Sequence, residues 1–268
     1  MKSDLSSGVL AGDIPFVECG DGDRPLIIIN GGQGFVRRAD PVRAERDARR
    51  VSRILPPGTA FVLLGYPSRP VREGAVSNLV DDLASAIRER WAGPIVLLGI
   101  SYGGILAAWL TVRHPQLVKR LVFIASARRF SSEGEQRVRR QIAFARSRNF
   151  SGFLADFGAV FRRPWLNALV WLRINLGRRS LAEGMNDADT IASYLSAILE
   201  AGTPPTEQIQ APTLVIGGSH DQFFGEGMME ETARSITDAR LELLHGETHM
   251  APVERANDMT IAIGNFLG

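Results

Sequence analysis

The chain of 268 residues has little of several residue types, and these shortages exclude some classes of protein. Cys19 is the single cysteine, so an internal disulfide and a cysteine-based zinc site are both excluded. The first residues contain no hydrophobic segment of the kind that a secretory signal needs. We therefore expect a cytoplasmic location. Hydrophobic residues at 45% and charged residues at 22% are typical of a soluble globular protein.

Lysine is also scarce, because Lys2 and Lys119 are the only two in the chain. Arginine therefore carries almost all of the positive charge. The formal net charge is only +2, but it is unevenly spread. Residues 128–179 hold twelve arginines and three acidic residues, whereas residues 181–268 hold fourteen acidic residues and three arginines. No nucleic-acid-binding motif accompanies the basic stretch, so we expect no nucleic-acid partner.

One run of twenty residues, GPIVLLGISYGGILAAWLTV at 93–112, is free of charge and has the length of a membrane span. Its glycines argue against that interpretation, and we expect no transmembrane segment. Residues 95–98 are typical of a buried strand, and residues 105–112 are typical of a helix. Between them, residues 99–103 form a G-x-S-x-G pattern. A strand, a tight turn and a helix in this order would lift Ser101 into a cleft, whereas an incidental serine at a buried junction is the alternative.

Strand-like and helix-like segments alternate over most of the chain, which predicts a parallel sheet covered on both faces. The expected strands, after an N-terminal hairpin near Val9 and residues 16–18, lie at 26–30, 60–64, 95–98, 121–125, 213–216 and 241–244. The expected helices lie at 40–55, 74–91, 105–112, 226–236 and 252–267. Only helical patterns occur between the fourth of the buried strands and Pro204-Pro205. We therefore expect a core of residues 1–126 and 206–268, with residues 127–205 as an inserted helical cap.

Polar residues gather directly after several of these strands. In a sheet of this kind, ligands bind beyond the carboxyl ends of the strands. The loop Asn30-Gly31-Gly32-Gln33-Gly34 follows the first buried strand, and Ser101 follows the central one. Asp221 follows residues 213–216, and His249 follows the last strand. A serine, an acid, a histidine and a glycine loop are thus expected at one edge of the sheet.

These residues make the chain resemble an α/β-hydrolase over nearly its whole length. The likeness rests on the elbow GISYGG, the order Ser…Asp…His, the helical insertion, and the segments APTLVIGGSHDQFF and LELLHGETHMAPVERANDMTIAIGNFL. The resemblance implies an α/β fold with a mostly parallel sheet, helices on both faces and an inserted cap. It also implies Ser101 as nucleophile, His249 as general base and Asp221 as the acid that orients this base. It implies no metal and no organic cofactor.

The same resemblance implies an oxyanion hole made by the backbone N–H groups of Tyr102 and Gly32, with Gln33 as the alternative to Gly32. The chain departs from many relatives at Asn30, where a histidine is usual, and this leaves the geometry of the glycine loop open. It departs again at residues 65–67, a Gly-Tyr-Pro corner that we expect to reshape the rim of the pocket.

Three other histidines compete with His249 for the role of base. His114 is expected at the surface, near the end of a helix. His220 neighbours Asp221 and could flank the site without acting. His245 ends the last strand directly, and it is the rival candidate for the base.

The cap gives what little the sequence says about the substrate. Residues 153–176 carry five aromatic side chains among leucines, namely Phe153, Phe157, Phe161, Trp165 and Trp171. They could simply pack on the core, or form an apolar acyl pocket. In the second case we expect Phe161 and Trp165, together with Gln33, to contact the substrate. The cap arginines would face either water or an anionic or carrier-linked substrate.

We expect a serine hydrolase that cleaves an ester, lactone or thioester bond of a small, mainly apolar molecule through an acyl-enzyme. A serine at the elbow counts against the relatives that use aspartate there, the dehalogenases and epoxide hydrolases. Two alternatives stay open. One is a biosynthetic thioesterase or cyclase acting on a carrier- or coenzyme-linked acyl group, and the other is a ligand-binding relative whose triad serves recognition. The oligomeric state does not follow from the sequence.

Overall fold

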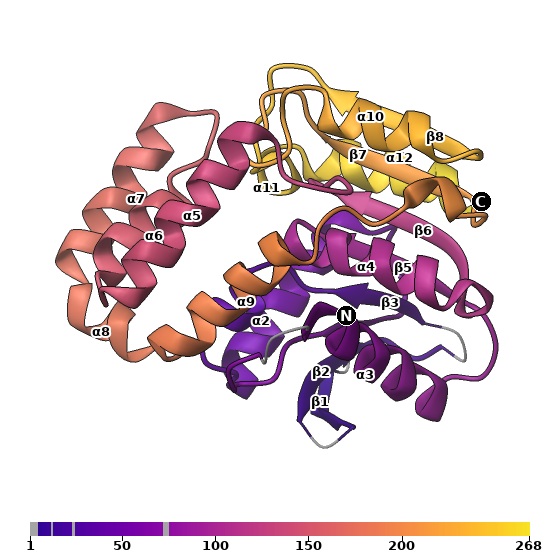
Figure 1. The fold of residues 1–268 in the computed structure, drawn as a ribbon, viewed down its shortest axis with the longest axis horizontal. Coiled ribbons are helices and arrows are strands. Elements are labelled where there is room, and N and C mark those ends of the chain that lie inside the picture. The colour runs from indigo at the N-terminus through magenta and orange to yellow at the C-terminus, as the bar shows by residue number, and fades with distance from the viewer. Residues whose placement is uncertain (1–4, 12, 23–24, 72–74) are drawn as a thin grey trace.

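The computed structural model describes residues 5–11, 13–22, 25–71 and 75–268. Its strands are β1 Leu5–Leu10, β2 Ile14–Cys19, β3 Leu26–Ile29, β4 Phe61–Leu64, β5 Ile95–Ile100, β6 Val118–Ile124, β7 Thr213–Gly218 and β8 Ala239–Leu244. They form one sheet of eight strands in the order β1-β2-β4-β3-β5-β6-β7-β8 (Figure 1). β2 pairs with β1 and with β4 in antiparallel register. The remaining neighbours, from β4 through β3, β5, β6 and β7 to β8, all pair in parallel register.

The central strands are apolar because both of their faces are covered. Every residue of β3 and β4 is buried. Successive side chains point to opposite faces of a strand, so Ile27 and Ile29 join one hydrophobic cluster while Ile28 joins the other. The sheet therefore has a hydrophobic core on each side, and helices must cover both.

The helices divide between these two faces and a group apart from the sheet. They are α1 Gln33–Val36, α2 Pro41–Val51, α3 Ala75–Arg90, α4 Tyr102–Arg113, α5 Ser132–Arg146, α6 Phe150–Gly158, α7 Pro164–Leu176, α8 Arg178–Glu183, α9 Ala188–Glu200, α10 Met228–Ser235, α11 Ala251–Glu254 and α12 Ala256–Leu267. Apolar residues of α3, α4 and α10 belong to one core cluster, and those of α2 and α12 belong to the other. The sheet is thus a middle layer between two layers of helices.

Helices α5 to α9 follow one another between β6 and β7, and α5 to α8 stand beside the sheet while α9 leads back to it (Figure 1). Side-chain caps start α5, α6 and α9. Ser131 accepts a hydrogen bond from Gly134 N at 3.1 Å, and Asn149 accepts one from Gly152 N at 3.0 Å. Such caps satisfy backbone N–H groups that a helix start leaves without partners. We call residues 127–205 the cap.

The predicted elements are confirmed, with differences at their ends. The uncharged run 93–112 is divided between β5 and α4, and no helix in the described part of the chain is long and apolar enough to cross a membrane. The helix predicted over 252–267 is two helices, because Arg255, at φ −130° and ψ 42°, interrupts the helical backbone. Part of the helix predicted at 74–91 cannot be compared, since Gly74 lies outside the described residues.

Candidate active site

Ser101 occupies the sharp turn between β5 and α4. Its backbone angles are φ 53° and ψ −121°, a conformation that residues with side chains rarely adopt. The glycines around it allow the strand and the helix to approach closely. A Cβ on Gly99 would lie 2.4 Å from Gly104 Cα, and one on Gly103 would lie 2.4 Å from the carbonyl oxygen of Ile29. The G-x-S-x-G pattern is therefore a steric requirement of this turn.

Three side chains from separate loops form a continuous hydrogen-bonded chain. Ser101 Oγ lies 2.9 Å from His249 Nε2, and His249 Nδ1 lies 2.8 Å from Asp221 Oδ2. Asp221 comes from the loop after β7, and His249 comes from the loop after β8. The distances and the order of the groups are those of a nucleophile, a base and an orienting acid. The sequence-predicted residues thus meet at the expected edge of the sheet.

Asp221, the acid of this hydrogen-bonded series, is held in place by its own loop. Asp221 is only 4% exposed, and its Oδ1 accepts hydrogen bonds from Phe223 N at 2.8 Å and Phe224 N at 3.0 Å. Its Oδ2 is left to face the imidazole. The backbone N–H of His249 donates to Gln222 Oε1 at 3.1 Å, so the same loop also holds the histidine. Both partners are therefore fixed before any substrate arrives.

The glycine loop after β3 lies against the serine. A Cβ on Gly31 would lie 3.5 Å from Ser101 Cβ. The N–H of Gly31 donates to Asn30 Oδ1 at 2.8 Å and is already engaged. Among the described residues, no acceptor receives a hydrogen bond from the N–H of Gly32, Gln33 or Tyr102. These three groups start α1 and α4 and are available to an anion, as at other helix starts.

A cavity of about 490 Å³ opens over Ser101 and His249, between the core and the cap. Its lining includes Phe161 and Gln33, two of the predicted substrate contacts. Trp165, the third of these residues, is 56% exposed on α7 and is not part of the cavity lining, so its contact with substrate stays a prediction. Among the residues that the structure describes, no group of His, Cys, Asp or Glu is arranged to hold a metal ion.

Three tyrosines and a phenylalanine support the glycine loop from below, and the sequence did not predict them. Tyr66, Tyr102, Tyr194 and Phe35 pack with ring centroids 4.8 to 5.7 Å apart. Tyr66 donates its hydroxyl to the carbonyl oxygen of Asn30. Burial raises the pKa of each tyrosine above its usual value, so all three stay neutral donors. Tyr66, at the corner 65–67, is 1% exposed and contacts the glycine loop, and the effect of this corner on the pocket rim stays a prediction.

The rival histidines lie away from the serine. His245 and His220 are exposed, and neither has a hydrogen bond to a triad member within the described part of the chain. His114 ends α4 and its Nε2 lies 2.8 Å from Asp81 Oδ1. The other ring nitrogen of His114, Nδ1, lies 3.0 Å from Arg88 Nη2.

Several cap arginines pair with acidic residues of the core, which accounts for the uneven charge of the sequence. Arg128 and Arg129 both contact Glu231. Arg162 Nε lies 3.2 Å from Glu247, and Arg163 lies 3.8 Å from Glu254. Arg255 Nη1 also reaches Glu247, at 3.1 Å. Four of the twelve arginines of the basic stretch thus connect the cap to the acidic C-terminal part of the core.

Comparisons with known proteins agree with this fold. The model of the alpha/beta hydrolase fold family matches residues 65–256. Proline iminopeptidase PfmaB of Pestalotiopsis fici is 27% identical, with 91% of each chain covered. The 2-hydroxy-6-oxononadienedioate/2-hydroxy-6-oxononatrienedioate hydrolase of Escherichia coli is 24% identical, over 95% of this chain and 90% of its own. Among solved structures, the enol-lactonase from Burkholderia xenovorans LB400 superposes with a TM-score of 0.71 at 20% identity, over 98% of this chain and 99% of that one.

Proposed function

Because the chain belongs to the α/β-hydrolase fold family, we propose that it is a serine hydrolase that cleaves an ester-like bond of a small, mainly apolar molecule. The observation that carries the proposal is the hydrogen-bonded chain from Ser101 through His249 to Asp221. A serine hydroxyl becomes an effective nucleophile when a neighbouring imidazole takes its proton and a carboxylate fixes the useful tautomer.

The reaction follows from these positions. His249 takes the hydroxyl proton as Ser101 Oγ attacks the carbonyl carbon, and a tetrahedral oxyanion forms. The N–H groups of Tyr102 and Gly32 donate to this oxyanion, with Gln33 as the alternative to Gly32. His249 then returns the proton to the leaving oxygen or sulfur, which departs from an acyl-enzyme. Water repeats the attack with the same base, and the acid product and free Ser101 result.

The cavity supports a small substrate. Its volume of about 490 Å³ is in the range of small-molecule sites, and residues 127–205 act as the cap that closes it from above. Apolar cap side chains, among them Phe157, Phe161 and Ile174, face the acyl part of the substrate. Esters, lactones and thioesters share the acyl-enzyme, so all three belong in the first substrate panel. The cytoplasmic location stays a prediction.

A fluorophosphonate probe and a panel of acyl esters and thioesters test this function. We expect intact-mass analysis to show one adduct on the protein and none on Ser101→Ala, and turnover to disappear in the same variant. His249→Ala should be nearly as inactive, whereas His245→Ala should keep its activity. Labelling that persists in Ser101→Ala, or a loss confined to His245→Ala, would contradict the assignment. A labelled protein that turns over no substrate would instead support a ligand-binding role.

A further inference from the structure

One end of the active-site cavity is lined by arginines. They come from both walls, and they are Arg37, Arg43, Arg46 and Arg50 of the core and Arg173 of the cap. Gln33, next to the oxyanion donor Gly32, also lines the cavity, and its Oε1 lies 3.5 Å from Arg50 Nη1. The arginines therefore lie on the glycine-loop side of the catalytic serine. None of the four core arginines belongs to the basic stretch that the sequence made conspicuous.

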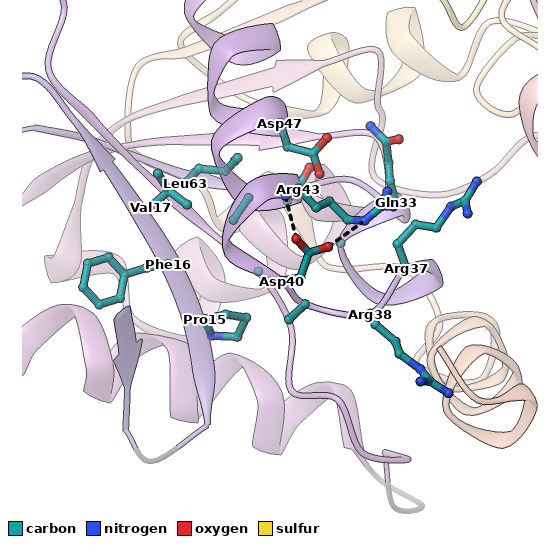
Figure 2. Close-up of a pocket in the computed structure, with 15 residues that line it drawn as sticks. Pro15, Phe16, Val17, Gln33, Arg37, Arg38, Asp40, Arg43, Asp47 and Leu63 are labelled. Carbon is teal, nitrogen blue, oxygen red and sulfur yellow. Dashed lines mark hydrogen bonds and ion pairs between the residues drawn. The ribbon is translucent and has the colours of Figure 1, made fainter. Parts of the chain in front are cut away.

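The positive charge at this end exceeds the negative charge around it. Asp47 is the acidic residue in the cavity lining, and its Oδ1 lies 3.3 Å from Arg50. Arg43 lies 3.6 Å from Asp40, as the dashed lines of Figure 2 show. Among the described residues, neither Arg46 nor Arg173 has an ion-pair partner. Five arginines thus face two carboxylates, which leaves an excess of three positive charges.

The surroundings make this excess unfavourable without an anion. Burial, followed by the nearby charges of Arg43 and Arg173, holds the pKa of the Arg37 guanidinium below its usual value. Burial also raises the pKa of Asp47, although the nearby charge of Arg50 opposes the shift. Arg37 extends away from Asp40 in Figure 2, and its Nη1 donates to the carbonyl oxygen of Leu181 at 3.1 Å. Unlike Arg162 and Arg163, which pair with core acids, Arg46 and Arg173 have no ion-pair partner among the described residues.

We propose that the cluster of Arg37, Arg43, Arg46, Arg50 and Arg173 binds a carboxylate at the far end of the substrate, so that the enzyme acts on monoesters of dicarboxylic acids or on lactones that carry a free carboxylate. The proposal rests on the proposed hydrolase activity. Guanidinium groups bind carboxylates with paired, charge-assisted hydrogen bonds. The scissile carbonyl lies at Ser101, an apolar chain crosses the region of Phe157 and Ile174, and the free carboxylate reaches the arginines. A cavity of about 490 Å³ holds a molecule of this size.

Matched substrates separate a carboxylate site from a solvated basic surface. The mono-p-nitrophenyl ester of adipic acid and p-nitrophenyl hexanoate have chains of the same length and differ in the terminal charge. We expect the enzyme to prefer the hemiester in kcat/KM, and we expect added NaCl to reduce that preference. The double variant Arg46→Gln/Arg173→Gln should lose about tenfold or more on the hemiester and less than about twofold on the neutral ester. These two side chains are chosen because neither is tied into an ion pair.

Arg49→Gln is the matched control, because Arg49 is on the same helix, is paired with Glu45 and does not line the cavity. It should change neither rate. Equal effects of the double variant on both esters, or an enzyme without preference for the hemiester, would overturn the proposal.

Binding to Ser101→Ala keeps the test independent of turnover. Calorimetry should show monomethyl adipate binding about tenfold or more tighter than methyl hexanoate, and the added double substitution should remove the difference. Equal affinity for the two esters would contradict the carboxylate site, even if the protein is an active hydrolase. Tight binding by a protein that hydrolyses nothing would refute only the hydrolase. Competition by inorganic phosphate stronger than by adipate would mean that the cluster prefers a phosphate group, which also contradicts the proposal.

Discussion

Replacing Asp221 by asparagine should disable the base without disturbing the fold. The two side chains have nearly the same shape, and the two oxygens of Asp221 have different partners. Oδ1 accepts from Phe223 N and Phe224 N, whereas Oδ2 faces His249 Nδ1 at 2.8 Å. An amide in this place must keep its oxygen on the two backbone donors, because its NH₂ group cannot accept from them. The NH₂ group is thereby forced to face the imidazole.

This orientation selects the wrong tautomer of the histidine. An NH₂ donor at Nδ1 requires a lone pair there, so the ring proton moves to Nε2. That nitrogen lies 2.9 Å from Ser101 Oγ and can then no longer take the hydroxyl proton. In a serine protease the same substitution lowers kcat by about 10⁴-fold. We expect a loss of the same order in Asp221→Asn, which corresponds to about 5.5 kcal/mol in the barrier.

Two measurements check this prediction. Steady-state kinetics on one good ester gives the loss in kcat, and nitrogen NMR of the imidazole reports which nitrogen carries the proton. Asp81→Asn is the matched control, since Asp81 also bonds a histidine, His114, at 2.8 Å, and it should leave kcat unchanged. A variant Asp221→Asn with more than about a tenth of the wild-type kcat, or with its proton still on Nδ1, would refute the reasoning.

Three further predictions concern the loop and the surface pair. Gly32→Val should lower kcat by about 10²-fold or more, the scale of losing one oxyanion donor, in the same ester assay, and an unchanged kcat would show that Gly32 is not the donor. Asn30→His should change kcat/KM by less than about tenfold, whereas a folded but inactive variant would give Asn30 a direct part in the reaction. The hydrogen bond from Arg113, together with that of His114, holds the pKa of Asp81 below its usual value. Asp81 therefore stabilises the fold at pH values above the carboxyl pKa of the unfolded chain, and this stabilisation is lost as the pH falls through the pKa of the folded state. Asp81→Asn should therefore melt below the wild type at pH 7, with the difference closing in acid; a difference that does not depend on pH would contradict this.

The sequence was sufficient wherever a local pattern has one structural meaning. The glycines at 99, 103 and 104 are required by the turn at Ser101, so their spacing identified the elbow. Asp221 and His249 could be placed because each follows an apolar strand, and parallel strands bring such positions to one edge. The period of the apolar residues likewise located the helices, except where Arg255 interrupts the last one.

Features that depend on which distant residues meet could not be predicted. The tyrosine cluster under the glycine loop joins residues 66, 102 and 194, and no local pattern relates them. Trp165 and Phe161 look alike in the sequence, yet one is exposed and the other lines the cavity. The arginines of the cap are numerous, but four of the twelve are paired with acids far along the chain. The arginines at the cavity end became visible only once core and cap were placed together.

Glu247 links the attachment of the cap to the loop that carries His249. Its side chain is 1% exposed and is shared by Arg162 of the cap and Arg255 of the core. It is also two residues from His249 on the same loop. Lifting the cap at this point removes one of the two cations from a buried carboxylate, which then favours a rearrangement of its loop. One buried carboxylate thus joins the cap to the loop that carries the general base.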